Sequence, residues 1–92
     1  MTALPIEEVL TEMERLGHLK ADIENDHTEG TCTVRLRASG DRELAVEGTD
    51  LTNLVSILLS SEIGRAGEEH RPKDALALQV LRTRVLRQGV SP

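Results

Sequence analysis

The segment TDLTNLVSILLSSEIG, residues 49–64, limits the possible folds more than any other part of the sequence. Its hydrophobic residues recur at helical spacing and cover an arc of about 240°, which leaves only a narrow polar strip. The sequence therefore predicts a helix that is capped by Thr49 or Asp50 and ends at Gly64. A helix this apolar must be covered on two sides, and a chain of 92 residues has only a small domain with which to cover it.

Alternating apolar and polar residues before this helix predict three strands. The strands are expected over residues 19–24, 32–38 and 42–47. If Ser39, Gly40 and Asp41 form a three-residue loop, Leu36 lies opposite Leu44 and Arg37 lies opposite Glu43. A two-residue loop would instead set Leu36 against Glu43 or Ala45 and break the apolar face, so the sequence favours the first register.

Two further helices are predicted on either side of these segments. The apolar stripe in PIEEVLTEMERLG ends at Gly17, and residues 72–88 lie between Pro72, which suits a first turn, and Gly89, which suits a helix end. The predicted order is therefore a helix, a three-stranded antiparallel meander and two helices. This is an α+β fold of two layers, expected to form a single domain over residues 1–92.

The last predicted helix has apolar side chains on two sides. One strip, centred on Leu81, suits the core, whereas Leu76 and Val80 form a second strip that a chain of this length has little left to cover. We expect Leu76 and Val80, together with Arg84 and Arg87, to form an interface with a partner. The simplest partner is a second copy of the chain, so the sequence predicts a homodimer.

Charge is distributed unevenly along the chain, whose net charge is -5. Residues 1–30 hold eight acidic against two basic side chains, a sum of -6, and residues 71–92 hold five basic against one acidic, a sum of +4. Such an asymmetry indicates a basic tail for nucleic acid, or an acidic helix beside a basic one in the same fold or in a neighbouring subunit.

Composition excludes several kinds of function. Phe, Tyr and Trp are absent, although single-stranded nucleic acids are usually held by stacking on aromatic rings and membrane-interface helices usually carry Trp or Phe. The longest apolar run has four residues, too few to span a bilayer. With one cysteine and no leader, the chain is expected in the cytoplasm, and nine Arg against two Lys suggest a bacterial or phage genome.

Candidate catalytic and metal-binding residues are few. Asp26, His27, Glu29 and Cys32 lie close together in the sequence, but their spacing matches no closed metal site. No Gly-rich phosphate loop and no nucleophile at a strand-to-helix turn occur in the sequence. We therefore expect no enzyme activity and no cofactor.

Arg35 and Arg37 alternate with the apolar residues of their strand and face outward. The favoured interpretation is cross-strand ion pairing on a solvated face, of Arg37 with Glu43 and of Arg35 with Glu47 or Asp22. The alternative is contact with an anionic partner on the outer face of the sheet.

Two functional hypotheses remain. The order helix, three strands, helix resembles in outline that of double-stranded RNA binding domains and of small YbaB-type nucleoid proteins, which would imply that the basic C-terminal helix meets phosphates. The acidic total charge argues against nucleic acid. We prefer a non-enzymatic protein-binding module, a homodimer that acts as an adaptor, a chaperone-like protein or a regulatory or inhibitory protein.

Overall fold

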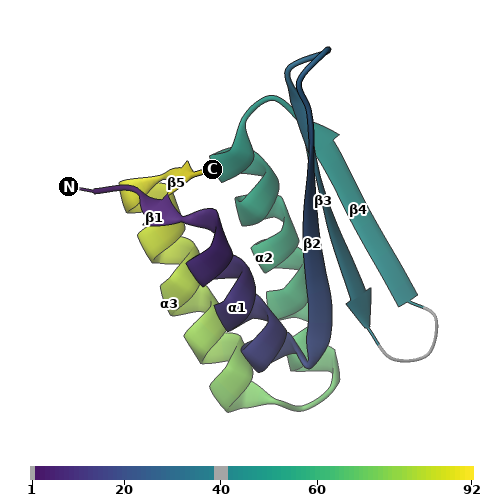
Figure 1. Cartoon of the computed structure of the whole chain (residues 1–92). Helices are drawn as coiled ribbons and strands as arrows, with labels where there is room; N and C mark the ends of the chain where they lie inside the picture. The colour runs from purple at the N-terminus through teal and green to yellow at the C-terminus, as the bar shows by residue number, and fades with distance from the viewer. Residues whose placement is uncertain (1, 39–41) are drawn as a thin grey trace.

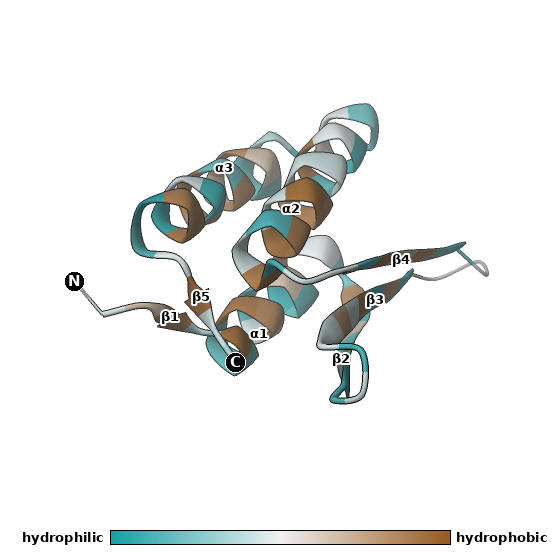
Figure 2. Ribbon diagram, turned by 90° about the horizontal axis from the view of Figure 1, so that it is seen from above, coloured by the Kyte–Doolittle hydropathy of each residue, from teal (hydrophilic) through white to brown (hydrophobic). Residues whose placement is uncertain are grey.

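The computed structural model describes residues 2–38 and 42–92 and has the predicted α+β order (Figure 1). Its elements are β1 (Leu4–Pro5), α1 (Ile6–Gly17), β2 (Leu19–Asp26), β3 (Thr31–Ala38), β4 (Arg42–Gly48), α2 (Leu51–Glu68), α3 (Pro72–Gln88) and β5 (Val90–Ser91). The helices gather on one face of the sheet: α1 and α2 lie against it, and α3 packs on the outer side of α1 and α2 (Figures 1 and 2).

The sheet β2-β3-β4 is antiparallel and has the register that the apolar pattern requires. Leu36 lies opposite Leu44 and Arg37 lies opposite Glu43, so the predicted pairing of β3 with β4 is confirmed. The loop on which that prediction was built, residues 39–41, lies outside the described residues. The register follows from the alternation of side chains, since a slip of one residue would place glutamates against the helices.

The hydrophobic core lies between the sheet and the helices and is built from aliphatic side chains. Its largest fully buried members are Met13, Leu58, Leu59, Leu78, Val9, Val34, Val55 and Val85. They come from α1, α2 and α3 and from β3, the central strand. Helix α2 contributes most to this set because it is covered on two sides, as its apolar circumference predicts.

Helix α2 continues beyond its predicted end at Gly64, and that prediction is wrong. The helix runs to Glu68, so residues 69–71 alone separate it from α3. Ala66 is fully buried, and Arg65 is held by hydrogen bonds to Glu62 and to the carbonyl of Gly17. These contacts stabilise one more turn of helix, which offsets the low helix propensity of glycine.

A short parallel pairing between β1 and β5 joins the two ends of the chain, and the sequence analysis does not anticipate it. The Leu4 N–H donates to the Gly89 carbonyl at 2.9 Å, and the Val90 N–H donates to Thr52 Oγ1, also at 2.9 Å. The first bond fixes the end of α3 beside the start of α1, and the second ties β5 to the first turn of α2 (Figure 1). Helices α1 and α3 therefore lie side by side and share one surface.

Candidate protein interface

A groove of about 430 Å³ lies between α1 and α3 on the outer side of the helical layer. Its floor is apolar and its rim is charged. The floor is formed by Leu16, Leu76, Ala77, Val80 and Leu81, and the rim by Glu12, Arg15, Lys73 and Arg84. Three of the four predicted interface residues, Leu76, Val80 and Arg84, therefore lie together in one surface feature.

The exposed floor of this groove is the second apolar strip of α3. Leu76 is 63% exposed and Val80 is 56% exposed, whereas Leu78, two residues from each and so on the opposite side of the helix, is fully buried. The two-sided apolar pattern of this helix is therefore present in the fold as predicted. Exposed apolar residues that cluster in a groove, rather than lying singly, are typical of an interaction site.

The rim of the groove is more basic than the protein as a whole. Arg15 Nη2 lies 2.7 Å from Glu12 Oε2, one turn earlier on α1. The hydrogen bond from Arg15 lowers the pKa of Glu12, and the charges of Arg15 and Arg84 lower it further, against the opposing effect of partial burial. Lys73 and Arg84 complete the rim, which holds three positive charges and one negative charge. Arg87, the fourth predicted residue, is exposed one turn beyond Arg84.

The acidic and basic ends of the sequence lie side by side in the same chain. Helix α1 packs along α3, and the Glu12 carboxylate is close enough to Arg84 for that charge to lower its pKa. The structure thus has an acidic helix beside a basic one within the same fold, which is one of the arrangements that the charge asymmetry indicated. At least part of the electrostatic attraction between the acidic and basic ends therefore acts within one chain, between α1 and α3.

The outer-face arginines occupy the strand positions that the alternation predicts. Arg35 Nη2 lies 3.2 Å from Glu24 Oε2 across the β2–β3 pair, which confirms cross-strand ion pairing for this residue, although with Glu24 and not with the expected Glu47 or Asp22. Arg37 is exposed and lies opposite Glu43 in the β3–β4 register. Both arginines lie on the face of the sheet opposite the helices, away from the α1–α3 groove.

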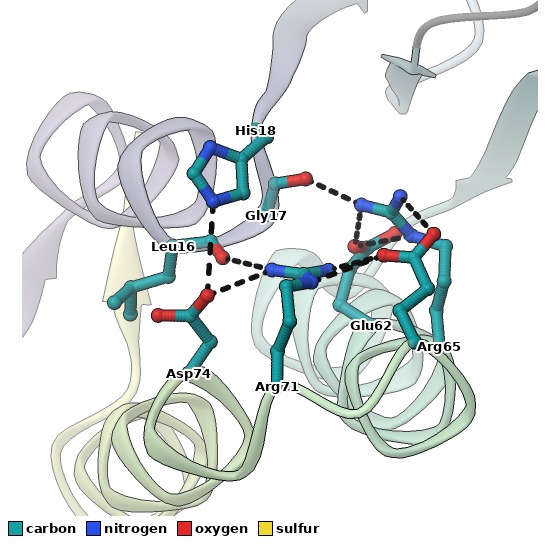
Figure 3. Close-up of polar contacts among 8 residues, drawn as sticks. Leu16, Gly17, His18, Glu62, Arg65, Arg71 and Asp74 are labelled. Carbon is teal, nitrogen blue, oxygen red and sulfur yellow. Dashed lines mark hydrogen bonds and ion pairs between the residues drawn. The ribbon is translucent and has the colours of Figure 1, made fainter.

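A second polar cluster joins the end of α1 to the turn between α2 and α3 (Figure 3). Arg65 Nη2 donates to Glu62 Oε2 at 2.6 Å and also to the carbonyl of Gly17. Arg71 Nη1 donates to the carbonyl of Leu16 at 2.9 Å. The last carbonyls of a helix have no partner within it, so two guanidinium groups cap the C-terminus of α1.

The same cluster contains carboxylates, and its contacts join α1 to α2 and α3. A hydrogen bond from Arg71 lowers the pKa of Glu69, as do the charges of Arg65, Arg71 and Arg42, against the opposing effect of burial. Burial disfavours the charge on Arg71, yet its hydrogen bonds to Asp74 and Glu69 raise its pKa above the ordinary value. General acid–base catalysis at neutral pH uses a group whose pKa lies near 7, and these two shifts lead away from it.

Gly17 is the point where α1 approaches this cluster most closely. A Cβ atom at this position would lie 2.8 Å from Leu19 Cδ2 and 3.1 Å from Glu62 Oε2. Glycine lets the helix end pass close to both side chains, which brings its carbonyl within reach of Arg65.

The groove and the cluster contain residues that the sequence analysis did not single out. Glu12 and Arg15 join the predicted residues only because α1 packs beside α3, whereas Lys73 has a local signal, since it lies one turn before Leu76 on α3. The Glu62–Arg65 pair has a local signal, since opposite charges three residues apart share a helix face.

Within the described residues, no three His, Cys, Asp or Glu side chains are grouped so that they could hold a metal ion. Cys32 is half-buried, and its Sγ lies 3.1 Å from Asn25 Oδ1. No helix in the described ranges is long and apolar enough to cross a membrane.

Comparison with protein-family models, curated proteins and solved structures finds no match to the chain.

Proposed function

We propose that the protein is a non-enzymatic protein-binding module that forms a homodimer through the α1–α3 groove, in the role of an adaptor, a chaperone-like protein or a regulator. The observation that carries this proposal is the exposure of Leu76 and Val80 on the apolar floor of a groove. Burying a side chain of this size fully is worth about 1.5 to 3 kcal/mol, so covering both residues gives a substantial driving force.

A second copy suits this surface because a two-fold axis brings the same apolar strip to both sides of the contact. If α3 packs antiparallel to its counterpart near Val80, the Leu76 and Val80 side chains of the two copies meet at the centre. Lys73 and Arg84 of the two copies then flank that centre and repel each other. The contact is therefore apolar at its middle and electrostatically strained at its rim.

This arrangement predicts that salt strengthens self-association. Raising the NaCl concentration from about 0.05 M to about 0.5 M shortens the range of charge interactions to a few Å, which weakens the repulsion between the rims. We expect a several-fold lower dissociation constant at the higher concentration, measured from the concentration dependence of methyl NMR shifts. The methyl signals of Leu76 and Val80 should move on dilution, and those of Ile57, which is exposed on α2 outside the groove, should stay in place. Dilution shifts confined to Ile57, or absent from Leu76 and Val80, would contradict the proposal.

Nucleic-acid binding through α3 is the second candidate, because Lys73, Arg84 and Arg87 are exposed on one helix. With 16 acidic against 11 basic residues and no aromatic ring for stacking, we expect no tight binding to duplex or single strands at physiological salt. Gel-shift titrations check this. A sub-micromolar shift that weakens with salt and is lost when Arg84 and Arg87 become glutamate would favour this candidate over the homodimer, which salt should strengthen.

A further inference from the structure

Strand β4 forms one edge of the sheet. One side of the strand pairs with β3, and the other side faces outward. Among the residues that the structure describes, β4 pairs with β3 alone. Arg42, Glu43, Leu44, Ala45 and Glu47 are exposed, and Val46 is half-buried. Figure 2 shows β4 at the outer margin of the sheet, with hydrophobic residues in the middle of the strand.

The direction of the backbone groups of β4 follows from a hydrogen bond on the opposite edge. The Ala21 N–H donates to Glu14 Oε2, so it points away from β3. Ala21 lies opposite Leu36, and backbone direction alternates along an antiparallel strand, so the N–H and C=O of Leu36 point toward β4 and bond Leu44. The backbone groups of Glu43, Ala45 and Glu47 therefore point outward.

The two edges of the sheet, β2 and β4, differ in how far their outward backbone groups are covered. On β2, Glu14 from α1 reaches the outward Ala21 N–H at 3.1 Å and covers part of that edge. On β4, three consecutive outward positions lie in an exposed stretch of strand. An edge with a row of outward N–H and C=O groups is a ready template for another strand.

The side chains of β4 present two rows of different chemistry. Glu43, Ala45 and Glu47 lie on the outer face of the sheet, and Leu44 and Val46 lie on the inner face, where Leu44 is still 37% exposed. Leu44 also lines a cavity of about 180 Å³ between the sheet and α2. A strand added here would meet two glutamates on one face and two apolar side chains on the other.

We infer that the edge of β4 binds an extended segment of a partner protein in which basic residues flank a central apolar pair, in the pattern basic, apolar, any, apolar, basic. The basic residues lie opposite Glu43 and Glu47, the apolar residues lie opposite Leu44 and Val46, and the backbone bonds the outward groups of Glu43, Ala45 and Glu47. Strand addition of this kind draws affinity from main-chain hydrogen bonds and specificity from alternate side chains.

Charge argues against a second copy of β4 as the occupant. Antiparallel self-pairing about Ala45 would set Glu43 directly against Glu47 of the other copy, twice. Moving the pairing by two residues still gathers four glutamates on neighbouring positions. Like charges in these positions destabilise a strand pair, whereas a basic segment is attracted to them.

The test uses two fluorescent seven-residue peptides, TKVTVKT and its acidic counterpart TEVTVET, titrated with the full-length protein at low salt. We expect the lysine peptide to bind at least tenfold more tightly than the glutamate peptide, with amide protection appearing at Glu43, Ala45 and Glu47. Ala45→Pro removes one outward N–H and leaves the ladder to β3 intact, since proline is tolerated on the outer side of an edge strand. This variant should keep its unfolding temperature and lose at least tenfold in affinity.

Charge reversal is the second variant and does not depend on the behaviour of proline. The double change Glu43→Lys and Glu47→Lys should reverse the preference between the two peptides. Equal binding of the lysine peptide by wild type and Ala45→Pro, or no saturable binding up to about 1 mM, would overturn the inference. Loss of self-association in Ala45→Pro would also overturn it, because the edge would then hold a second copy. Val80→Glu should bind the lysine peptide as wild type does, so the two proposals fail separately.

Discussion

Replacing Glu62 with alanine is expected to lower the free energy of unfolding by about 3 kcal/mol or more. Glu62 is 5% exposed, and the Arg65 side chain paired with it at 2.6 Å is 11% exposed. The substitution removes the closest carboxylate partner of the Arg65 guanidinium, which is buried beside the end of α1. The partner that remains, Glu69, lies 3.5 Å away and is 41% exposed, so the change still breaks a buried pair in the costly way. For a domain of this size, a loss of 1 kcal/mol lowers the unfolding temperature by about 4 to 8 °C, so we expect a drop of more than about 10 °C in calorimetry.

Glu12→Ala is the matched control for this prediction. Glu12 and Arg15 have the same residue types, the same three-residue spacing and a similar distance of 2.7 Å, but their side chains are 39% and 66% exposed. An exposed pair of this kind contributes about 1 kcal/mol or less. Similar losses in the two variants would mean that burial of the Glu62–Arg65 pair does not matter to stability.

Val80→Glu is expected to weaken self-association by about 100-fold or more. The change removes about 1.5 to 3 kcal/mol of apolar burial, and it adds a carboxylate that must be desolvated at the centre of the contact. Because Val80 is 56% exposed within one chain, the fold should tolerate the charge, and the unfolding temperature measured at low concentration should stay near that of wild type. Size-exclusion chromatography with light scattering reports the change as a shift to monomer.

Two control variants separate the groove from the rest of the surface. Ile57→Glu places the same charge on a side chain that is 48% exposed outside the groove, and Arg37→Glu reverses a charge on the outer face of the sheet. Both should self-associate as wild type does. Monomers formed by Ile57→Glu but not by Val80→Glu would move the interface to α2.

The sequence is sufficient to predict the strand register and the two-sided character of α3, because both depend on local periodicity. Only one register keeps Leu36 and Leu44 on the same face, and helical spacing alone separates Val80 from Leu81. Both features can be predicted without knowing which helices and strands contact one another.

The end of α2 and the composition of the groove could not be predicted in this way, because tertiary contacts decide both. Gly64 is a reasonable stop by propensity, but the burial of Ala66 and the bond from Arg65 to the carbonyl of Gly17 extend the helix. Likewise, Glu12 and Lys73 are remote in sequence and lie on one rim only because α1 packs against α3.

Sedimentation equilibrium of the wild-type chain tests the proposed homodimer most directly. At protein concentrations on the order of tens of micromolar, an ordinary range for interface affinities, the average mass should rise from 10.1 kDa toward twice that value. The rise should be steeper at about 0.5 M NaCl than at about 0.05 M, because screening weakens the repulsion between the basic rims. A mass of 10.1 kDa throughout, at both salt concentrations, would contradict the account and show that Leu76 and Val80 stay exposed in a monomer.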